Sequence, residues 1–199
     1  MIMRKFYRLK KLIVQGGFTL TEMLVAISVF VVVLGIVSAL FADIIKSQKR
    51  ALANQELLNQ TSYVLEYIGR AIRMAKKDDI DGPNCCLLGD KVNYELTRAG
   101  QGIVFRNYED QCQEFFWDVS DHRLKEIKGG VGPTPLTSAD SDVTSFKIGP
   151  SDSWDQEDDY DQPRVTLFLD IKKLGFPSGE EPKIKIQTTV SQRNLDVKY

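Results

Sequence analysis

The chain has 199 residues, of which 43% are hydrophobic and 27% charged, so it allows one compact domain plus an extended element but not two large domains. Its net charge of −1 conceals an asymmetry, because the first 17 residues contain no acid and five bases: Arg4, Lys5, Arg8, Lys10 and Lys11. The remainder carries 21 basic and 27 acidic residues, a formal charge of −6. Phosphate binding needs clustered Lys and Arg, so this acidic body argues against nucleic acid as a partner.

The longest apolar run follows the basic start and extends from Met23 to Ala42 without a charged residue. A helix of this length spans roughly 30 Å, the thickness of the hydrocarbon core of a bilayer. A buried core helix is an alternative, but a helix that is apolar all round needs a larger protein to surround it. A cleaved secretory signal is another, but no small-residue cleavage site follows Ala42. The run therefore predicts a retained membrane anchor.

The junction between the basic start and the apolar run reads Gly-Gly-Phe-Thr-Leu-Thr-Glu-Met-Leu over residues 16–24. The Gly pair offers an unhindered peptide bond that a protease could accept in an extended conformation. Thr19 and Glu22 have the spacing of a capping box, which predicts that a helix begins here. The positive N-terminal end of the helix dipole could by itself stabilise the Glu22 carboxylate. An acid so close to the membrane interior, however, also suggests a cationic partner.

These residues resemble the type IV prepilin superfamily, in which a Gly precedes Phe-Thr-Leu-x-Glu and an apolar helix. The resemblance is close over residues 16–42 and departs only slightly, at Thr21, where an aliphatic residue is common. It implies that a prepilin peptidase cuts between Gly17 and Phe18 and methylates the new amine of Phe18. It also implies that Glu22 neutralises the N-terminal amine of a neighbouring subunit in a filament of pilins or pseudopilins.

The resemblance and the charge pattern together predict four segments. Residues 1–17 are a basic leader, residues 18–43 the transmembrane and assembly half of a helix, residues 44–77 its amphipathic half, and residues 78–199 an extracytoplasmic head rich in strands. The positive leader should remain in the cytoplasm, so the protein would cross the inner membrane once, N-terminus inside, before it enters a pilus or pseudopilus.

The helix is expected to continue from Thr19 to Lys77, because good helix formers dominate and Gly69 is the only Gly or Pro between residues 44 and 77. Apolar and small residues recur there at three- and four-residue spacing, which predicts a stripe that packs on a sheet. The stripe consists of Leu57, Thr61, Val64, Leu65, Ile68, Ala71, Ile72 and Ala75.

After a turn-rich break at residues 78–84 the period changes to two, which is typical of strands. The expected strands are Val92–Arg98, Gly102–Tyr108, Glu114–Val119, Arg123–Ile127, Val143–Ile148, Arg164–Lys173 and Lys183–Ser191. Residues 129–142, rich in Gly, Pro and Ser, are expected to form a loop. The predicted fold is α+β: one long N-terminal helix on an antiparallel sheet of five to seven strands, a pilin-like roll.

Three cysteines, Cys85, Cys86 and Cys112, fall in the segment expected outside the membrane. An oxidising compartment favours one disulfide, between Cys112 and either Cys86, our preference, or Cys85. Closing a loop of about 26 residues would contribute roughly 3–4 kcal/mol in the chain-entropy model.

Residues 152–161 hold six carboxylates and two aromatic residues. Oxygen-rich loops can bind calcium, and the candidate ligands are Asp155, Glu157, Asp158 and Asp159. The spacing of an EF-hand is missing, so we expect a solvated acidic loop. Alternatively, Trp154 and Tyr160 could form a recognition surface for a neighbouring subunit.

No catalytic motif accompanies the single histidine, His122, so the chain is predicted not to be an enzyme and to need no cofactor. The resemblance implies a structural minor pilin or pseudopilin of a type IV pilus, a type II secretion system or a competence apparatus. Residues 24–30 also resemble the pseudopilin J or pilin W type. The alternative is a bitopic, membrane-anchored binding or adhesion protein that forms no filament.

Overall fold

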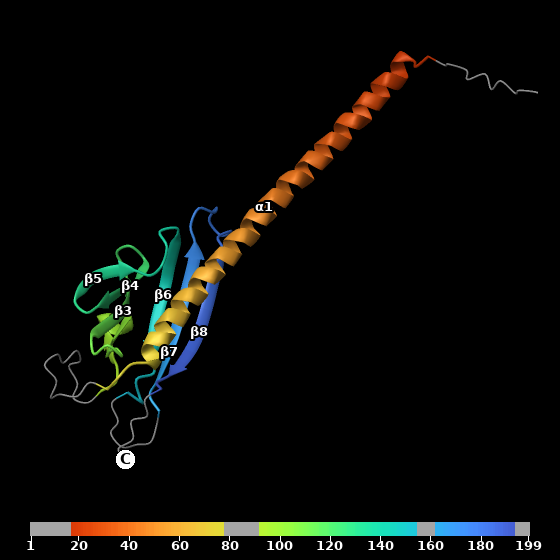
Figure 1. Cartoon of the computed structure of the whole chain (residues 1–199). Helices are drawn as coiled ribbons and strands as arrows, with labels where there is room; N and C mark the ends of the chain where they lie inside the picture. The colour runs from red at the N-terminus through yellow and green to blue at the C-terminus, as the bar shows by residue number, and fades with distance from the viewer. Residues whose placement is uncertain (1–16, 78–91, 155–161, 194–199) are drawn as a thin grey trace, which may run out of the picture. The chain divides into compact units, whose positions relative to one another are not determined.

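The computed structural model describes residues 17–77, 92–154 and 162–193 and divides the chain into two compact units, Met1–Gln48 and Lys49–Tyr199. One helix comes first and the strands follow (Figure 1). The elements are α1 (Leu20–Arg73), β1 (Glu95–Thr97), the 3-10 turn η1 (Arg98–Gly100), β2 (Gly102–Arg106), β3 (Cys112–Asp118), β4 (Arg123–Lys128), β5 (Val131–Pro135), β6 (Ser141–Gly149), β7 (Arg164–Lys173) and β8 (Lys183–Ser191).

The strands form two antiparallel sheets, one in the order β1-β2-β3-β4-β5 and the other in the order β6-β7-β8. The predicted α+β class, a long N-terminal helix packed with antiparallel strands, is confirmed. The expectation of a single sheet with five to seven strands is wrong. Sequence patterns identify strands but not their partners, and β6 pairs with β7 instead of continuing the first sheet.

The second half of α1 packs on the strands through the stripe that its periodicity predicts. Its buried residues are Ala53, Leu57, Thr61, Val64, Leu65, Ile68, Gly69 and Ile72. Strands β6, β7 and β8 lie side by side along this part of the helix in Figure 1. Helical periodicity thus places one apolar face against the sheet and leaves the opposite face to solvent.

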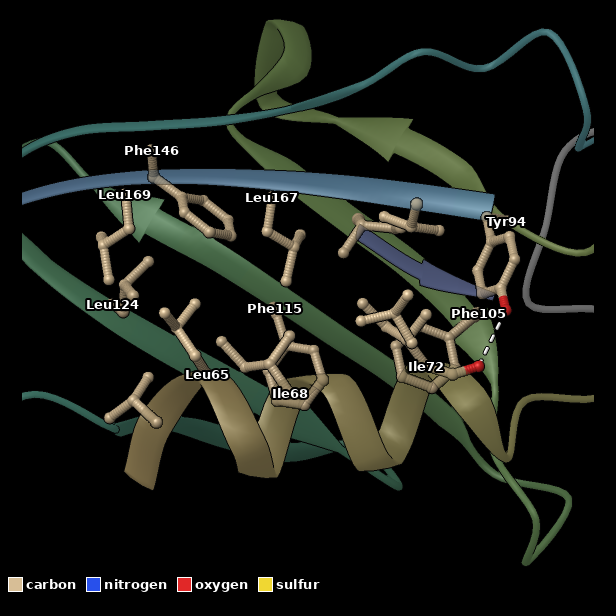
Figure 2. Close-up of a cluster of buried hydrophobic side chains, with 14 of the residues drawn as sticks. Leu65, Ile68, Ile72, Tyr94, Phe105, Phe115, Leu124, Phe146, Leu167 and Leu169 are labelled. Carbon is tan, nitrogen blue, oxygen red and sulfur yellow. Dashed lines mark hydrogen bonds between the residues drawn. The ribbon is translucent and has the colours of Figure 1, made fainter. Parts of the chain in front are cut away.

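Both sheets contribute to one hydrophobic core (Figure 2). Ile68 of α1 is completely buried, as are Phe105 and Phe115 of the first sheet and Leu167 and Leu169 of the second. The Phe105 and Phe115 rings lie 5.8 Å apart. One continuous core explains why Lys49–Tyr199 forms one unit although it contains two separate sheets.

The helix ends at Arg73, four residues before the predicted end, because groups from distant segments bind its last carbonyls. The Tyr94 hydroxyl donates to the Ile72 carbonyl at 2.8 Å (Figure 2), and the Arg193 amide donates to the Arg73 carbonyl at 2.8 Å. Lys76 already forms an isolated bridge, its amide donating to the Arg106 carbonyl at 2.9 Å. These tertiary partners replace further helical hydrogen bonds.

The expected loop at residues 129–142 is partly wrong, because β5 lies within it and pairs with β4. Pro133 and Pro135 suggested a loop, since proline cannot donate to a ladder. An edge strand tolerates proline where that side of the strand has no partner, and β5 is the edge of its sheet with every residue exposed.

Candidate assembly site

The first turn of α1 forms the capping box that the sequence predicts. The Glu22 amide donates to Thr19 Oγ1 at 3.2 Å, and the Thr19 amide donates to Glu22 Oε2 at 3.2 Å. The Thr19 carbonyl accepts the first helical bond, from the Met23 amide, at 3.1 Å. These reciprocal bonds satisfy two backbone donors that a helix start leaves free, so they fix the beginning of the helix at Thr19.

The Glu22 carboxylate is exposed and has only local hydrogen-bond partners among the described residues. Its Oε2 accepts from the amide and, at 3.2 Å, from the hydroxyl of Thr19. No salt bridge from a described residue reaches it. The carboxylate therefore keeps lone pairs with which it could bind a cation from another molecule.

Phe18 and the apolar part of α1 are exposed as well. The Phe18 side chain is 83% exposed, and every residue from Leu20 to Ala42 is exposed. By length and composition, α1 is the one helix in the described part of the chain that could cross a membrane. Such an apolar surface is far larger than a soluble monomer normally shows, which indicates contact with lipid or with other helices.

The two serines of the apolar segment do not need an outside partner. Ser28 Oγ donates to the Val25 carbonyl at 2.8 Å, and Ser38 Oγ donates to the Leu34 carbonyl at 2.8 Å. Because these hydroxyls return to their own helix, they lower the cost of placing the segment in an apolar environment. Glu22 is thus the first charged group at this end of α1, at the border of the apolar surface.

This end of the chain matches a known protein family. Residues 14–38 match the family described as the prokaryotic N-terminal methylation motif. The chain therefore carries a prokaryotic N-terminal methylation motif, which is consistent with a type IV pilin or pseudopilin. The match includes Gly17, Phe18 and Glu22 and extends over most of the exposed apolar part of α1. The motif implies processing by a prepilin peptidase and assembly with other pilins. Together with the apolar helix, the motif supports the interpretation of the chain as a membrane-anchored, pilin-like protein.

No curated protein and no solved structure matches the chain.

The predicted disulfide falls partly within the described residues. Cys112 begins β3 and is disulfide-bonded. Cys85 and Cys86 lie outside the described residues, so the pairing of Cys112 with Cys86 stays a prediction.

The candidate calcium ligands Asp155, Glu157, Asp158 and Asp159 also lie outside the described residues, as does Tyr160. Trp154, however, does not form a recognition surface, because its side chain is only 2% exposed. Its indole donates to the Arg164 carbonyl at 2.7 Å, and its ring meets Tyr94 edge-on with centroids 5.6 Å apart. A tryptophan beside an acidic run can thus belong to the core when its N–H finds a backbone acceptor.

His122 lies in the turn before β4 and contacts Asp142 of β6, with 2.8 Å between Nδ1 and Oδ1. Lys172 Nζ lies 3.2 Å from the other oxygen of Asp142. The described residues contain no group of three or more His, Cys, Asp or Glu side chains that could hold a metal ion. His122 is therefore part of a polar contact between the two sheets.

Two polar contacts that fix α1 on the strands were missed by sequence reasoning. Lys173, whose side chain is 8% exposed, contacts Asp140 and, at 3.0 Å, Glu56 of α1. Burial alone would lower the pKa of Lys173, but the hydrogen bonds to Asp140 and Glu56 outweigh it and raise that pKa. Likewise, burial and the bond from the Tyr67 hydroxyl to Glu126, 2.8 Å, raise the pKa of Tyr67 to about 12.

Only one sequence signal pointed to these contacts: polar residues stand beside the apolar stripe of α1. Their partners lie far along the chain, and periodicity does not identify them.

Proposed function

We propose that this chain is a minor pilin or pseudopilin that assembles through α1 into the filament of a type IV pilus, type II secretion system or competence apparatus. The observation that carries the proposal is the methylation motif at residues 14–38, continued by an apolar helix whose surface is wholly exposed in the isolated chain. Such a surface needs lipid before assembly and neighbouring helices after it. The size of the head and the similarity of residues 24–30 support a minor subunit of pseudopilin J or pilin W type.

In this proposal a prepilin peptidase removes residues 1–17, and the amine of Phe18 is methylated. The positive leader keeps the N-terminus in the cytoplasm and the head, residues 78–199, outside. The exposed Glu22 carboxylate then receives the Phe18 amine of a neighbouring subunit. Because an unpaired charge among packed apolar helices costs several kcal/mol, this pair would favour the one stagger that brings both charges together.

A membrane-anchored binding protein is the second candidate. A largely apolar pocket of about 370 Å³ supports it, which lies between the end of α1 and the first sheet and has Tyr67, Met74, Tyr108 and Lys128 among its lining residues. In that case α1 would only hold the head at the membrane, and Glu22 would be replaceable.

The two candidates differ in what they expect of Glu22→Gln. The chain is expressed in cells that contain the peptidase and the other filament subunits, with Ser28→Ala as the control because Ser28 bonds only to its own helix. In a pilin, both variants reach the membrane and are processed, but only Ser28→Ala enters the sheared filament fraction at the wild-type level. Equal incorporation of Glu22→Gln would refute the role of Glu22, and a wild-type chain absent from filaments would favour the binding protein.

A further inference from the structure

The pocket between the end of α1 and the first sheet has walls of apolar side chains. Tyr67, Ala71 and Met74 follow one another at four- and three-residue spacing, so they lie on one side of α1. The pocket is completed from the first sheet, where Tyr108 belongs to the turn between β2 and β3. Met74 and Tyr108 are both exposed, so apolar surface remains there that the core does not use.

The helix side of this pocket is fixed by contacts with the first sheet. The Tyr67 hydroxyl donates to Glu126 Oε1 at 2.8 Å, and its ring meets Phe115 edge-on with centroids 5.9 Å apart. Gln113, which also lines the pocket, is buried and donates to the same Glu126 oxygen at 2.5 Å. Tyr67 and Gln113 are therefore held in position before any ligand arrives.

The turn that carries Tyr108 is fixed as well. The buried Asn107 side chain donates to Gln113 Oε1 at 3.2 Å. Its own Oδ1 accepts hydrogen bonds from the amides of Glu109 and Gln111, each at 3.0 Å. The pocket is thus preformed, as small-molecule sites usually are.

The charged residues that line the pocket, among those the structure describes, are the bases Arg70 and Lys128. The nearest acids line other hollows. Glu109 and Glu126 line an adjoining pocket beside β5, and Glu66 lines a groove between α1 and β8. The charge presented by the pocket is therefore positive, although the body of the chain is acidic.

Both bases can bind a further anion. Arg70 contacts Glu66 at 2.9 Å, and Lys128 contacts Glu109 at 2.8 Å. A guanidinium and an ammonium have more N–H groups than these contacts use. Ion pairs as exposed as these contribute little stability, so they resist a competing carboxylate only weakly. Lys128 Nζ also lies 5.8 Å from the centre of the Tyr108 ring, which places a positive charge next to the apolar wall.

We propose that this pocket binds a small aromatic carboxylate. The ring would pack against Tyr67, Met74 and Tyr108, since aromatic rings interact favourably with other rings and with the sulfur of methionine. The carboxylate would accept charge-assisted hydrogen bonds from Arg70 and Lys128. A cationic ligand is disfavoured because both bases would repel it. The volume of about 370 Å³ is near the lower end for small-molecule sites, which fits one ring with a short acid arm.

Two sources could supply this chemistry: a free aromatic acid, or a peptide that ends in phenylalanine with a free carboxylate. The inference deepens the second candidate function, the membrane-anchored binding protein, because it names the ligand class of the same pocket. It does not require that the chain stays outside filaments.

The Met74 methyl group provides a reporter within the pocket. The full chain, labelled with ¹³C in its methionine methyl groups, is placed in lipid nanodiscs, so that no free detergent competes for the site. It is titrated with 3-phenylpropionate and followed by nuclear magnetic resonance. We expect a saturable shift of the Met74 signal with a Kd of about 0.1–1 mM, a usual affinity for a ligand of this size. The signal of Met23, in the apolar part of α1, controls for partition into lipid.

The charge requirement is tested with 3-phenylpropanamide, which has the same shape without the charge and should bind at least about fivefold more weakly. Arg70→Gln with Lys128→Gln should weaken binding of the acid to the level of the amide, and unchanged binding of the amide would show that the pocket is intact. The control, Arg73→Gln with Lys147→Gln, removes the same charge from exposed residues that do not line the pocket. It should bind both probes as the wild type does.

The inference would be overturned by the absence of a saturable Met74 shift, by equal binding of the acid and the amide, or by equal losses in the two double variants. A titration with the peptide Gly-Ser-Gly-Phe then distinguishes the sources. Tighter binding than that of 3-phenylpropionate would support the end of a protein chain as the occupant, and weaker binding would support a free acid. Failure of the titration would remove the support for the binding protein, whereas the filament test of Glu22→Gln would stand unaffected.

Discussion

Tyr94→Phe tests how α1 ends on the head. The Tyr94 side chain is 2% exposed, and its hydroxyl donates to the Ile72 carbonyl in the last turn of the helix. Phenylalanine keeps the edge-on ring contacts with Phe105 and Trp154, at 6.1 and 5.6 Å, so the variant removes the hydroxyl and leaves the packing. The Ile72 carbonyl would then lose its side-chain donor at a buried position.

The expected loss is about 1–2 kcal/mol, because the variant removes one buried hydrogen bond while the Ala75 amide still donates to the same carbonyl at 3.1 Å. For a folded unit of the size of Lys49–Tyr199, 1 kcal/mol corresponds to roughly 2–4 °C, so Tm should fall by about 2–8 °C. Thermal unfolding is followed by near-ultraviolet circular dichroism of the full chain in detergent. The control is Tyr63→Phe, because the Tyr63 side chain is 73% exposed, and its Tm should not change measurably.

The pH dependence of stability provides a second test of the same contact. Burial raises the pKa of Tyr94 above its ordinary value of 10.0. The folded state therefore holds this proton more tightly than the unfolded state, and stability is lost as the pH rises above 10. Tyr94→Phe should lose less stability between pH 10 and pH 11 than the wild type does. The assigned hydrogen bond would be refuted if Tyr94→Phe had the same Tm as Tyr63→Phe and if its stability changed with pH as that of the wild type does.

Two further substitutions examine the core and the disulfide. Ile68→Ala removes a completely buried side chain from the stripe of α1 and should cost about 2–5 kcal/mol in denaturant unfolding, whereas Leu52→Ala, 65% exposed, should cost less than about 0.5 kcal/mol. Similar losses for both would contradict the observed packing. Cys112→Ser should cost about 3–4 kcal/mol and make the midpoint of unfolding insensitive to reducing agent. An equally stable variant would show that this disulfide does not restrain the unfolded chain.

The features that the sequence predicts best are those decided by neighbours along the chain. The capping box joins Thr19 and Glu22, which are three residues apart, so its spacing alone identifies the start of α1. The bounds of β7 and β8 agree with the prediction because both strands alternate regularly between more buried and less buried positions. In these cases local periodicity and burial act in the same direction.

The features that the sequence does not predict depend on distant partners. The end of α1 is set by Tyr94 and Arg193, and β5 is a strand only because β4 lies beside it. Trp154 is buried because the Arg164 carbonyl accepts its N–H. To predict each of these features, one must know which distant segments contact each other. The pattern within a single segment does not contain that information. For the same reason the sequence does not identify the partner that we propose for the exposed Glu22.

The first residue of the mature protein tests the central claim most directly. The full chain is expressed with a prepilin peptidase, purified from membranes and measured by mass spectrometry of the intact protein and of its N-terminal peptide. The account predicts that the mature chain begins with N-methylated Phe18. A chain that retains Met1, or one cut after Ala42, would contradict assignment to the prepilin-type subunits.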